Sequence, residues 1–188
     1  LYMAATLSGS VSWPTSETLL SAQGDADVLL IKEGVGEGAS WVQRFGGLNR
    51  DRAVDVVVDA NSHVSVTGTF QSGFKVDGAL LPHTGGEDVF LLSLDAEGVP
   101  RWALGLGGLG DDSASGLALG PDNSLVLIAE AHSPASFGGE VVTSQEGEEL
   151  GVIAAYTDLG AVRYARAIVS AGSLTLHDVL VDAEGAAH

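Results

Sequence analysis

The sequence predicts an all-β protein, built as about three four-stranded antiparallel blades of a β-propeller with about 61 residues each. Three observations predict this fold: self-similarity at a fixed period, short apolar stretches separated by turn residues, and the lack of any helical spacing of apolar residues. A β-sandwich has no physical reason to repeat its sequence at a fixed period, whereas the blades of a propeller do. We expect the 188 residues to form a single propeller segment.

The period is clearest at an aromatic residue that is followed by two glycines. Trp41 with the glycines at 46–47 recurs about 61 residues later as Trp102 with the glycines at 107–108, and Tyr164 follows at about the same interval. Further anchors at this spacing are Asp27 with Asp88, Leu19 with Leu80, and Asp51 with Asp112. Such a period is typical of repeat architectures in which each unit packs on its neighbours.

The repeat divides the chain into blades at residues 1–51, 52–112 and 113–175, followed by 176–188. The first blade lacks its first strand, because residues 1–3 align with 64–66, and residues 176–182 supply only the first strand of a further blade. Propellers close with about four to eight blades, so we expect a fragment of a larger propeller. The alternatives are that the two ends meet within one ring or between two chains, which would remove both open edges.

The second unit carries the clearest strand signals in its first half. Residues 54–58 alternate apolar with other side chains, end in small polar residues at 59–62, and resume as an alternating run at 64–70. Alternation broken by a short polar turn predicts a tight β-hairpin. Residues 71–87 are too many for a turn, so we expect a protruding loop there.

The second half of the unit predicts another hairpin. Residues 88–94 form an apolar run closed by the turn residues 95–98, and the segment 99–106 follows with Trp102 inside it. No part of the chain combines helical apolar spacing with a cap and a glycine stop, so almost no helix is expected.

Composition excludes several classes of partner. The chain has 8 basic against 25 acidic residues, with a formal net charge of −17, and Lys32 and Lys75 are its lysines. Phosphate backbones and anionic headgroups are bound by clustered Lys and Arg, so nucleic acid and membrane surfaces are not expected partners. No apolar run is long enough to insert into a membrane. The absence of cysteine excludes disulfides and thiolate sites but leaves the compartment open.

Acidic residues recur just before the predicted third strand of each unit. Asp25 and Asp27 precede it in the first unit, and Glu87 and Asp88 in the second. Because calcium takes six to eight oxygen ligands, these four carboxylates are the candidate calcium ligands of the chain, and no other cofactor is expected. Their spacing matches no defined calcium loop, so solvated turns are the favoured interpretation.

No catalytic residue is predicted. The glycines of 105–110 have the spacing of a dinucleotide-binding loop, but Asp111 and Asp112 follow them and would repel phosphate. Serine, histidine and aspartate are all present without a nucleophile-elbow motif, and a triad is recognised by geometry. Catalysis is therefore left without support from the sequence.

The tryptophans are candidates for ligand contact. Trp41 and Trp102 occupy the same position of the repeat, so we expect them to pack between blades, with stacking on sugars as the alternative. Trp13 lies beside Pro14 and has no aromatic counterpart in the other units. It is therefore the candidate contact residue for a protein or glycan partner.

The strongest unit resembles a known family. Its pattern consists of Phe45, Gly46, Gly47 and Asp51, then 56–59, 64–68 and 88–95, and finally Trp102. This pattern resembles the bacterial β-propeller repeats known as SBBP repeats, over nearly the whole chain. The resemblance implies a propeller in a secreted or surface-exposed bacterial protein and supplies no catalytic motif. Tyr164 replaces the tryptophan in the third unit, which departs from the pattern.

The sequence is compatible with three functions. The leading hypothesis is a non-catalytic module that binds or scaffolds through its protruding loops, because the sequence repeats without a site. The first alternative is an enzyme of the hydrolase or lyase type, with carboxylates gathered in the propeller channel. The second alternative is a purely structural, self-associating repeat array.

Overall fold

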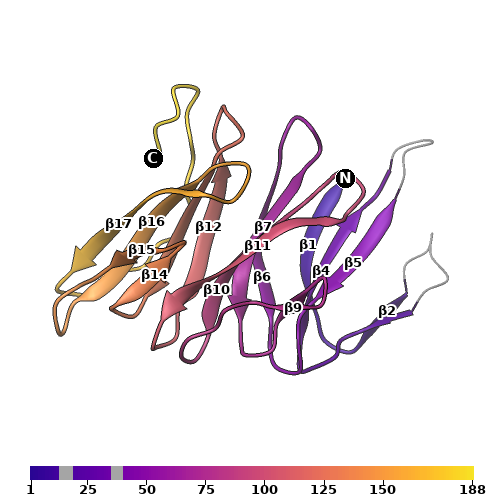
Figure 1. Cartoon of the computed structure of the whole chain (residues 1–188), viewed down its shortest axis with the longest axis horizontal. Coiled ribbons are helices and arrows are strands. Elements are labelled where there is room, and N and C mark those ends of the chain that lie inside the picture. The colour runs from indigo at the N-terminus through magenta and orange to yellow at the C-terminus, as the bar shows by residue number, and fades with distance from the viewer. Residues whose placement is uncertain (13–18, 35–39) are drawn as a thin grey trace.

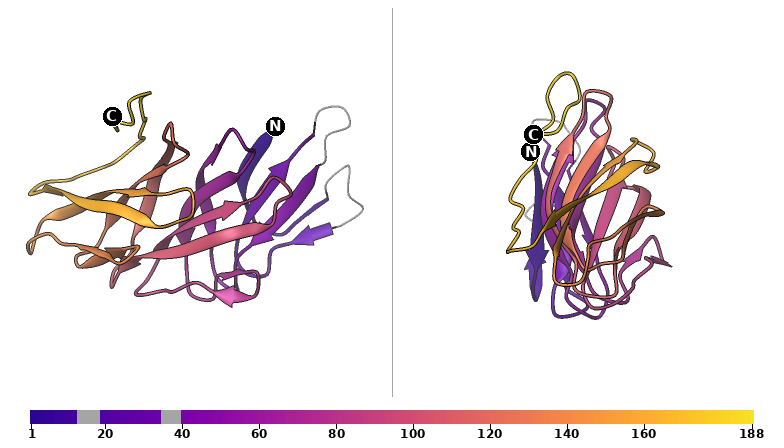
Figure 2. Two further views of the ribbon diagram at one scale, coloured as in Figure 1. Left: turned by 45° about the horizontal axis from the view of Figure 1, so that its top comes forward. Right: turned by 90° about the vertical axis from the view of Figure 1, so that its left-hand side faces the viewer.

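The computed structural model is all-β, as Figure 1 shows, and the all-β prediction is confirmed. It describes residues 1–12, 19–34 and 40–188. These residues contain no helix, and therefore none that could span a membrane. Three main antiparallel sheets follow one another in chain order along the long axis of the molecule (Figures 1 and 2). None of these sheets closes on itself.

The first sheet has the order β1-β4-β5 and comprises β1 (Tyr2–Leu7), β4 (Asp27–Lys32) and β5 (Trp41–Phe45). The second is built on β6 (Arg52–Val58), β7 (Val64–Phe70), β10 (Asp88–Leu94) and β11 (Pro100–Gly108), in this order. The third comprises β12 (Ser113–Leu119), β13 (Leu125–Ala131), β16 (Glu149–Tyr156) and β17 (Val162–Ser170), also in chain order. We call the contact between the first and second sheets the first junction, and that between the second and third sheets the second junction.

Each sheet has a short hairpin in its chain connections, before β4 in the first sheet, before β10 in the second and before β16 in the third. These hairpins are β2 (Ser10–Ser12) with β3 (Leu19–Ser21), β8 (Lys75–Val76) with β9 (Ala79–Leu80), and β14 (Ala135–Phe137) with β15 (Glu140–Val142). Two of them reach back to the preceding sheet: Lys75 pairs with Gly46, and β14 pairs with Gly107 and Gly108 of β11. Each of these hairpins therefore ties one sheet to the one before it.

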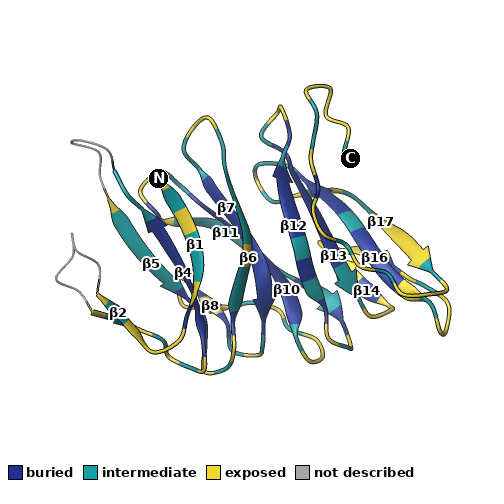
Figure 3. Cartoon of the chain, turned by 180° about the vertical axis from the view of Figure 1, so that it is seen from behind, coloured by how far each residue is buried: buried dark blue, intermediate teal, exposed yellow. Residues whose placement is uncertain are grey.

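The predicted strands of the second unit are confirmed with small shifts at their ends. The hairpin β6–β7 turns at residues 59–63, as the polar turn predicts, and β10 has the expected bounds. Strand β10 reads as a continuous apolar run because both of its faces are buried (Figure 3). Phe90 packs into the first junction, whereas Leu91 packs into the second.

The segment 71–87, expected to be a protruding loop, is anchored to the core through Phe74. Phe74 is fully buried and stacks on Phe90 with 5.0 Å between the ring centroids. Burying a phenylalanine contributes about 1.5–3 kcal/mol, which favours attachment of the segment over a free loop. The tip at Asp77 and Gly78 remains exposed.

Residues 176–182, expected to be the first strand of a further blade, form no strand in this structure. In that range a single isolated bridge joins Val181 to Ala187, and residues 173–180 have no strand structure. Val179 is nevertheless buried, and it packs on Ala118 and Ile128 of the third sheet. A strand needs a backbone ladder with a neighbour, whereas this segment contacts the third sheet through side chains and through the N–H of Leu176, which donates to Glu130 Oε1 (2.9 Å).

The repeated tryptophans join successive sheets. The ring of Trp41 lies against Gly98 in the turn between β10 and β11, and its Nε1 donates to the carbonyl of Ala96 (3.0 Å). Trp102 lies in the same way against Gly160, and its Nε1 donates to the carbonyl of Asp158 (2.9 Å). Both rings are half-buried, so they pack between the sheets as expected without being enclosed.

Candidate functional site between the sheets

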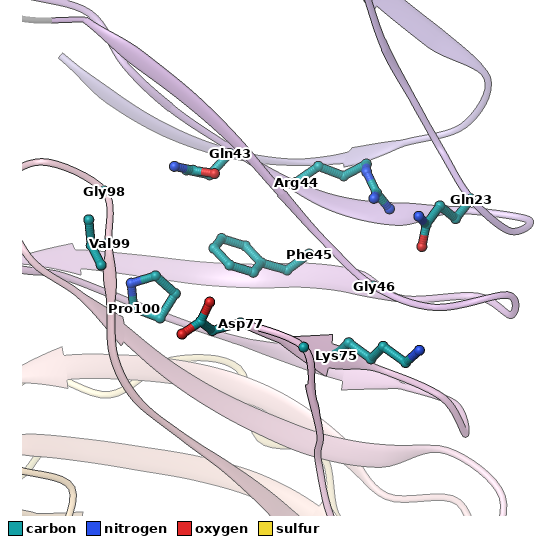
Figure 4. A pocket seen from close by; sticks show the side chains of 11 residues that line it. Gln23, Gln43, Arg44, Phe45, Gly46, Lys75, Asp77, Gly98, Val99 and Pro100 are labelled. Carbon is teal, nitrogen blue, oxygen red and sulfur yellow. The ribbon is translucent and has the colours of Figure 1, made fainter.

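A groove of about 460 Å³ opens at the first junction (Figure 4). It is lined by residues from the segment before β4, from β5, from the β8–β9 hairpin and from the start of β11 with the turn before it: Gln23, Gln43, Arg44, Phe45, Gly46, Lys75, Asp77, Gly78, Gly98, Val99 and Pro100. Figure 4 shows Gln43 and Arg44 on one wall, with Asp77 and Lys75 on the opposite wall. The groove therefore combines two basic side chains and one carboxylate, that of Asp77, with amides and a few apolar side chains.

The basic side chains of the groove differ in how they are held. Arg44 forms an ion pair with the buried carboxylate of Asp27 through its Nη1. The exposed Lys75 is fixed through its backbone, whose N–H donates to the carbonyl of Gly46 (3.4 Å). Because Arg44 is already paired with Asp27, the exposed ammonium group of Lys75 is the group in the groove that favours an anionic ligand.

The second junction is filled where the first is open. Gly105 takes the place of Arg44, and the backbone carbonyl of Pro82 lies where a side chain at Gly105 would begin. The side chain of Val162 lies 3.0 Å from the position that a Cβ on Gly138 would occupy. The composition of the groove is therefore a property of the first junction and not of the repeat.

Beneath the groove, two buried aspartates meet. Asp27 opens β4, and Asp51 lies in the link from β5 to β6; both are 0% exposed. Asp51 accepts the N–H of Gly47 (2.8 Å) and the N–H of Gln71 (3.2 Å), so it connects three segments. Asp27 accepts the N–H of Gln23 (2.8 Å) besides its ion pair with Arg44. We call Asp27 and Asp51 the first carboxylate pair.

The second junction repeats this arrangement. Asp88 opens β10, and Asp112 lies in the link from β11 to β12; they are 2% and 1% exposed. Asp112 accepts the N–H of Gly108 (2.6 Å) and the N–H of His132 (2.6 Å), while Asp88 accepts the N–H of Thr84 (2.5 Å). These contacts are the equivalents of those in the first junction, residue for residue. We call Asp88 and Asp112 the second carboxylate pair.

Burial raises the pKa of one member of each pair. For Asp51, loss of solvation raises the pKa to about 6 against the lowering effect of two backbone hydrogen bonds, and the charge of Asp27 raises it further. For Asp88, loss of solvation also raises the pKa to about 6, and Asp112 adds to the shift, while the Thr84 hydrogen bond and His83 oppose it. Paired carboxylates with raised pKa values are typical of acid–base sites, but at 0 to 2% exposure these cannot touch a substrate.

The candidate calcium ligands do not come together. Asp25 is exposed, and Glu87 forms an ion pair with Arg52 (2.9 Å), whereas Asp27 and Asp88 are buried in different junctions. Within the described ranges, no group of three or more His, Cys, Asp or Glu side chains is arranged to hold a metal ion. Trp13, the candidate contact residue, lies outside the described residues.

Serine, histidine and aspartate meet at one place in the second junction. His63 Nδ1 lies 2.9 Å from Asp59 Oδ2, and Ser65 lines the same small cavity. This cavity has a volume of about 10 Å³, which is the space of a single water molecule. It therefore has no room for a substrate.

Sequence reasoning missed the partnership within each carboxylate pair. Asp27 with Asp88, and Asp51 with Asp112, were visible as anchors of the repeat. The available signal was their joint recurrence with the double glycine, since the N–H of the second glycine binds the second aspartate in both copies.

No family model matches the chain. Among curated proteins, the chain is similar to the regulatory protein FlaEY of Caulobacter vibrioides, with 25% identity over 151 residues. The alignment covers 78% of this chain and 16% of FlaEY. The chain therefore spans about a sixth of that protein, and the role of the whole relative is not carried over.

Proposed function

We propose that this chain is a segment of a β-propeller and serves as a non-catalytic binding module. The observation that carries the proposal is the equivalence of the two junctions. The contact of Trp41 with Gly98 and the first carboxylate pair recur as the contact of Trp102 with Gly160 and the second carboxylate pair. In a propeller, each blade is a sheet that packs on the next blade through the same contacts. The resemblance to SBBP repeats supports the same assignment, and with it a place in a secreted or surface-exposed bacterial protein.

The groove at the first junction is the proposed binding surface. Strand β5 is the outer strand of its sheet, and the groove runs beside Gln43, Arg44 and Phe45. An outer strand offers backbone donors and acceptors to an added strand, and side-chain pockets beside it supply specificity. The exposed Lys75 favours an acidic side chain on that strand. The proposed partner is therefore an extended, acidic segment of another protein.

Titration of the isotope-labelled chain with a peptide of alternating valine and glutamate tests this function by NMR. We expect the amide signals of 43–45 and of Lys75 to shift on binding. A peptide of alternating valine and lysine is the matched control and should leave them in place. The Lys75→Glu variant should weaken binding of the acidic peptide by about tenfold, the worth of one favourable charged contact of about 1.4 kcal/mol.

Two results would contradict this proposal. The first is equal binding of the acidic and basic peptides. The second is a set of shifts that maps to the β14–β15 hairpin or to β17 and leaves β5 unchanged. Either would mean that the groove is not the contact surface.

A further inference from the structure

The two members of each carboxylate pair converge on one glycine. A Cβ added to Gly46 would lie 2.6 Å from Asp27 Oδ1 and 2.8 Å from Asp51 Oδ2. A Cβ added to Gly107 would in the same way meet Asp88 Oδ1 (2.7 Å) and Asp112 Oδ2. In each pair, one oxygen of each aspartate therefore borders the same small space beside a glycine. A side chain at that glycine would collide with both oxygens.

One oxygen in each pair is buried and has no hydrogen-bond partner among the residues that the structure describes. These oxygens are Asp27 Oδ1 and Asp88 Oδ1, and each belongs to an aspartate that is 0% or 2% exposed. A buried carboxylate oxygen without a donor is costly, and two ionised carboxylates side by side in a dry space repel one another. A proton or another positive group beside these oxygens would offset both costs.

A proton meets this need, whereas a metal ion does not. Calcium takes six to eight oxygen ligands, and no group of three or more potential ligand side chains exists in the described part of the chain. A shared proton needs only two acceptor atoms, and each pair has two carboxylate oxygens beside the same glycine. We propose that each carboxylate pair binds one proton, held in an O–H···O hydrogen bond between its two aspartates, so that each junction carries one buried negative charge instead of two.

The charged groups on the surrounding elements are consistent with one proton in each pair. Around the first pair they are Arg44 on β5, Arg50 in the link to β6 and Lys75 on β8; around the second they are His83, Glu87, Asp111 and His132. Arg44 balances the single charge left on the first pair. In the described ranges no arginine forms an ion pair with the second carboxylate pair. His132 Nδ1 lies 4.0 Å from Asp112, on an exposed side chain. Backbone N–H groups hold the remaining charge there.

The pH dependence of folding follows from the raised pKa values. Asp51 and Asp88 have pKa values of about 6 in the folded chain against 3.8 ordinarily, so folding favours their protonated forms. The resulting stabilisation is fully present below about pH 4 and is lost as the pH rises through about 6. A pKa of about 6 in the folded chain in place of 3.8 corresponds to about a hundredfold change in the folding equilibrium constant for each pair.

Asp88→Asn tests the proposal because its amide keeps the shape of the aspartate. The amide N–H replaces the shared proton at every pH, and its carbonyl oxygen still accepts from Thr84. Denaturant unfolding between pH 5 and pH 8 should show a smaller loss of stability for Asp88→Asn than for the wild type, with the variant the more stable at pH 8. Asp27→Asn should act in the same way on the first pair, because its amide N–H takes the place of Asp27 Oδ1 and its carbonyl oxygen still accepts from Gln23. Glu97→Gln, at an exposed site, is the control and should retain the wild-type dependence.

A direct measurement covers the case of a variant that does not fold. The ¹³Cγ signals of Asp51 and Asp88 in the wild type should titrate near pH 6 by NMR. Titration of both below pH 4 would overturn the proposal, as would a pH dependence in Asp88→Asn as steep as that of the wild type. Stabilisation of the wild type by calcium at pH 8, abolished in Asp88→Asn, would also overturn it and assign a cation site instead.

Discussion

At the scale of single residues, the aspartates and tryptophans do more than their positions in the repeat indicate. Asp51 and Asp112 each bind the backbone of two segments, so one carboxylate fixes the path from one sheet into the next. Trp41 and Trp102 fix the opposite end of the same contact through a turn glycine. Two side chains in each unit therefore set how successive sheets pack.

Trp102→Ala should destabilise the chain by about 3 kcal/mol, the lower end of the range for losing a large aromatic side chain, because the ring is half-buried. Trp102→Phe keeps most of the packing and removes the hydrogen bond to Asp158, so it should cost about 1 kcal/mol. Urea unfolding followed by circular dichroism measures both. A loss below about 1 kcal/mol for Trp102→Ala would show that the repeated aromatic is a surface feature open to ligands.

At the scale of elements, the β8–β9 hairpin links the core to the groove. Phe74 is 0% exposed and contacts both Phe70 and Phe90, while Lys75 and Asp77, next in the chain, line the groove. A segment that looks like a loop in sequence is therefore held by one aromatic anchor. The position of the groove wall depends on that anchor.

Phe74→Ala should detach the hairpin as well as open a cavity. We expect a loss of about 3–5 kcal/mol, as for other buried phenylalanines. Hydrogen exchange at the amide of Lys75 should become faster, because its bond to Gly46 depends on the anchored hairpin. Leu80→Ala, at a site that is 62% exposed, is the control and should change stability by less than about 0.5 kcal/mol. Unchanged exchange at Lys75 in Phe74→Ala would show that the hairpin does not need its anchor.

At the scale of the whole molecule, charge and packing act against each other. The sheets are joined by apolar clusters in both junctions, yet the chain carries a net charge of −17, which repels itself in the compact state. The described surface has exposed acidic turns. The few arginines already form ion pairs with some of the acidic side chains, as Arg163 does with Asp122. Screening of the remaining charge should therefore stabilise the fold.

The melting temperature should rise by about 2–4 °C between 10 and 200 mM sodium chloride at pH 7, which corresponds to about 1 kcal/mol for a chain of this size. At the isoelectric pH of about 4.3 the same salt should have little effect, because the net charge is then close to zero. Calorimetry at both pH values measures this. An equal rise at both would attribute the effect to preferential exclusion of the salt and not to charge screening.

The sequence by itself determined the class of the fold and most strand positions in the second unit. Alternation at 64–70 and the apolar run at 88–94 are local properties, because side-chain direction and burial repeat every two residues along a strand. Only the tertiary structure decided that Asp27 meets Asp51, that Arg44 and Lys75 share a groove, and that 176–182 packs without forming a strand. These features depend on how one sheet stacks on the next. Spacing along a chain does not encode contacts between residues that lie far apart in it, so the repeat showed where the aspartates recur but not that they face each other.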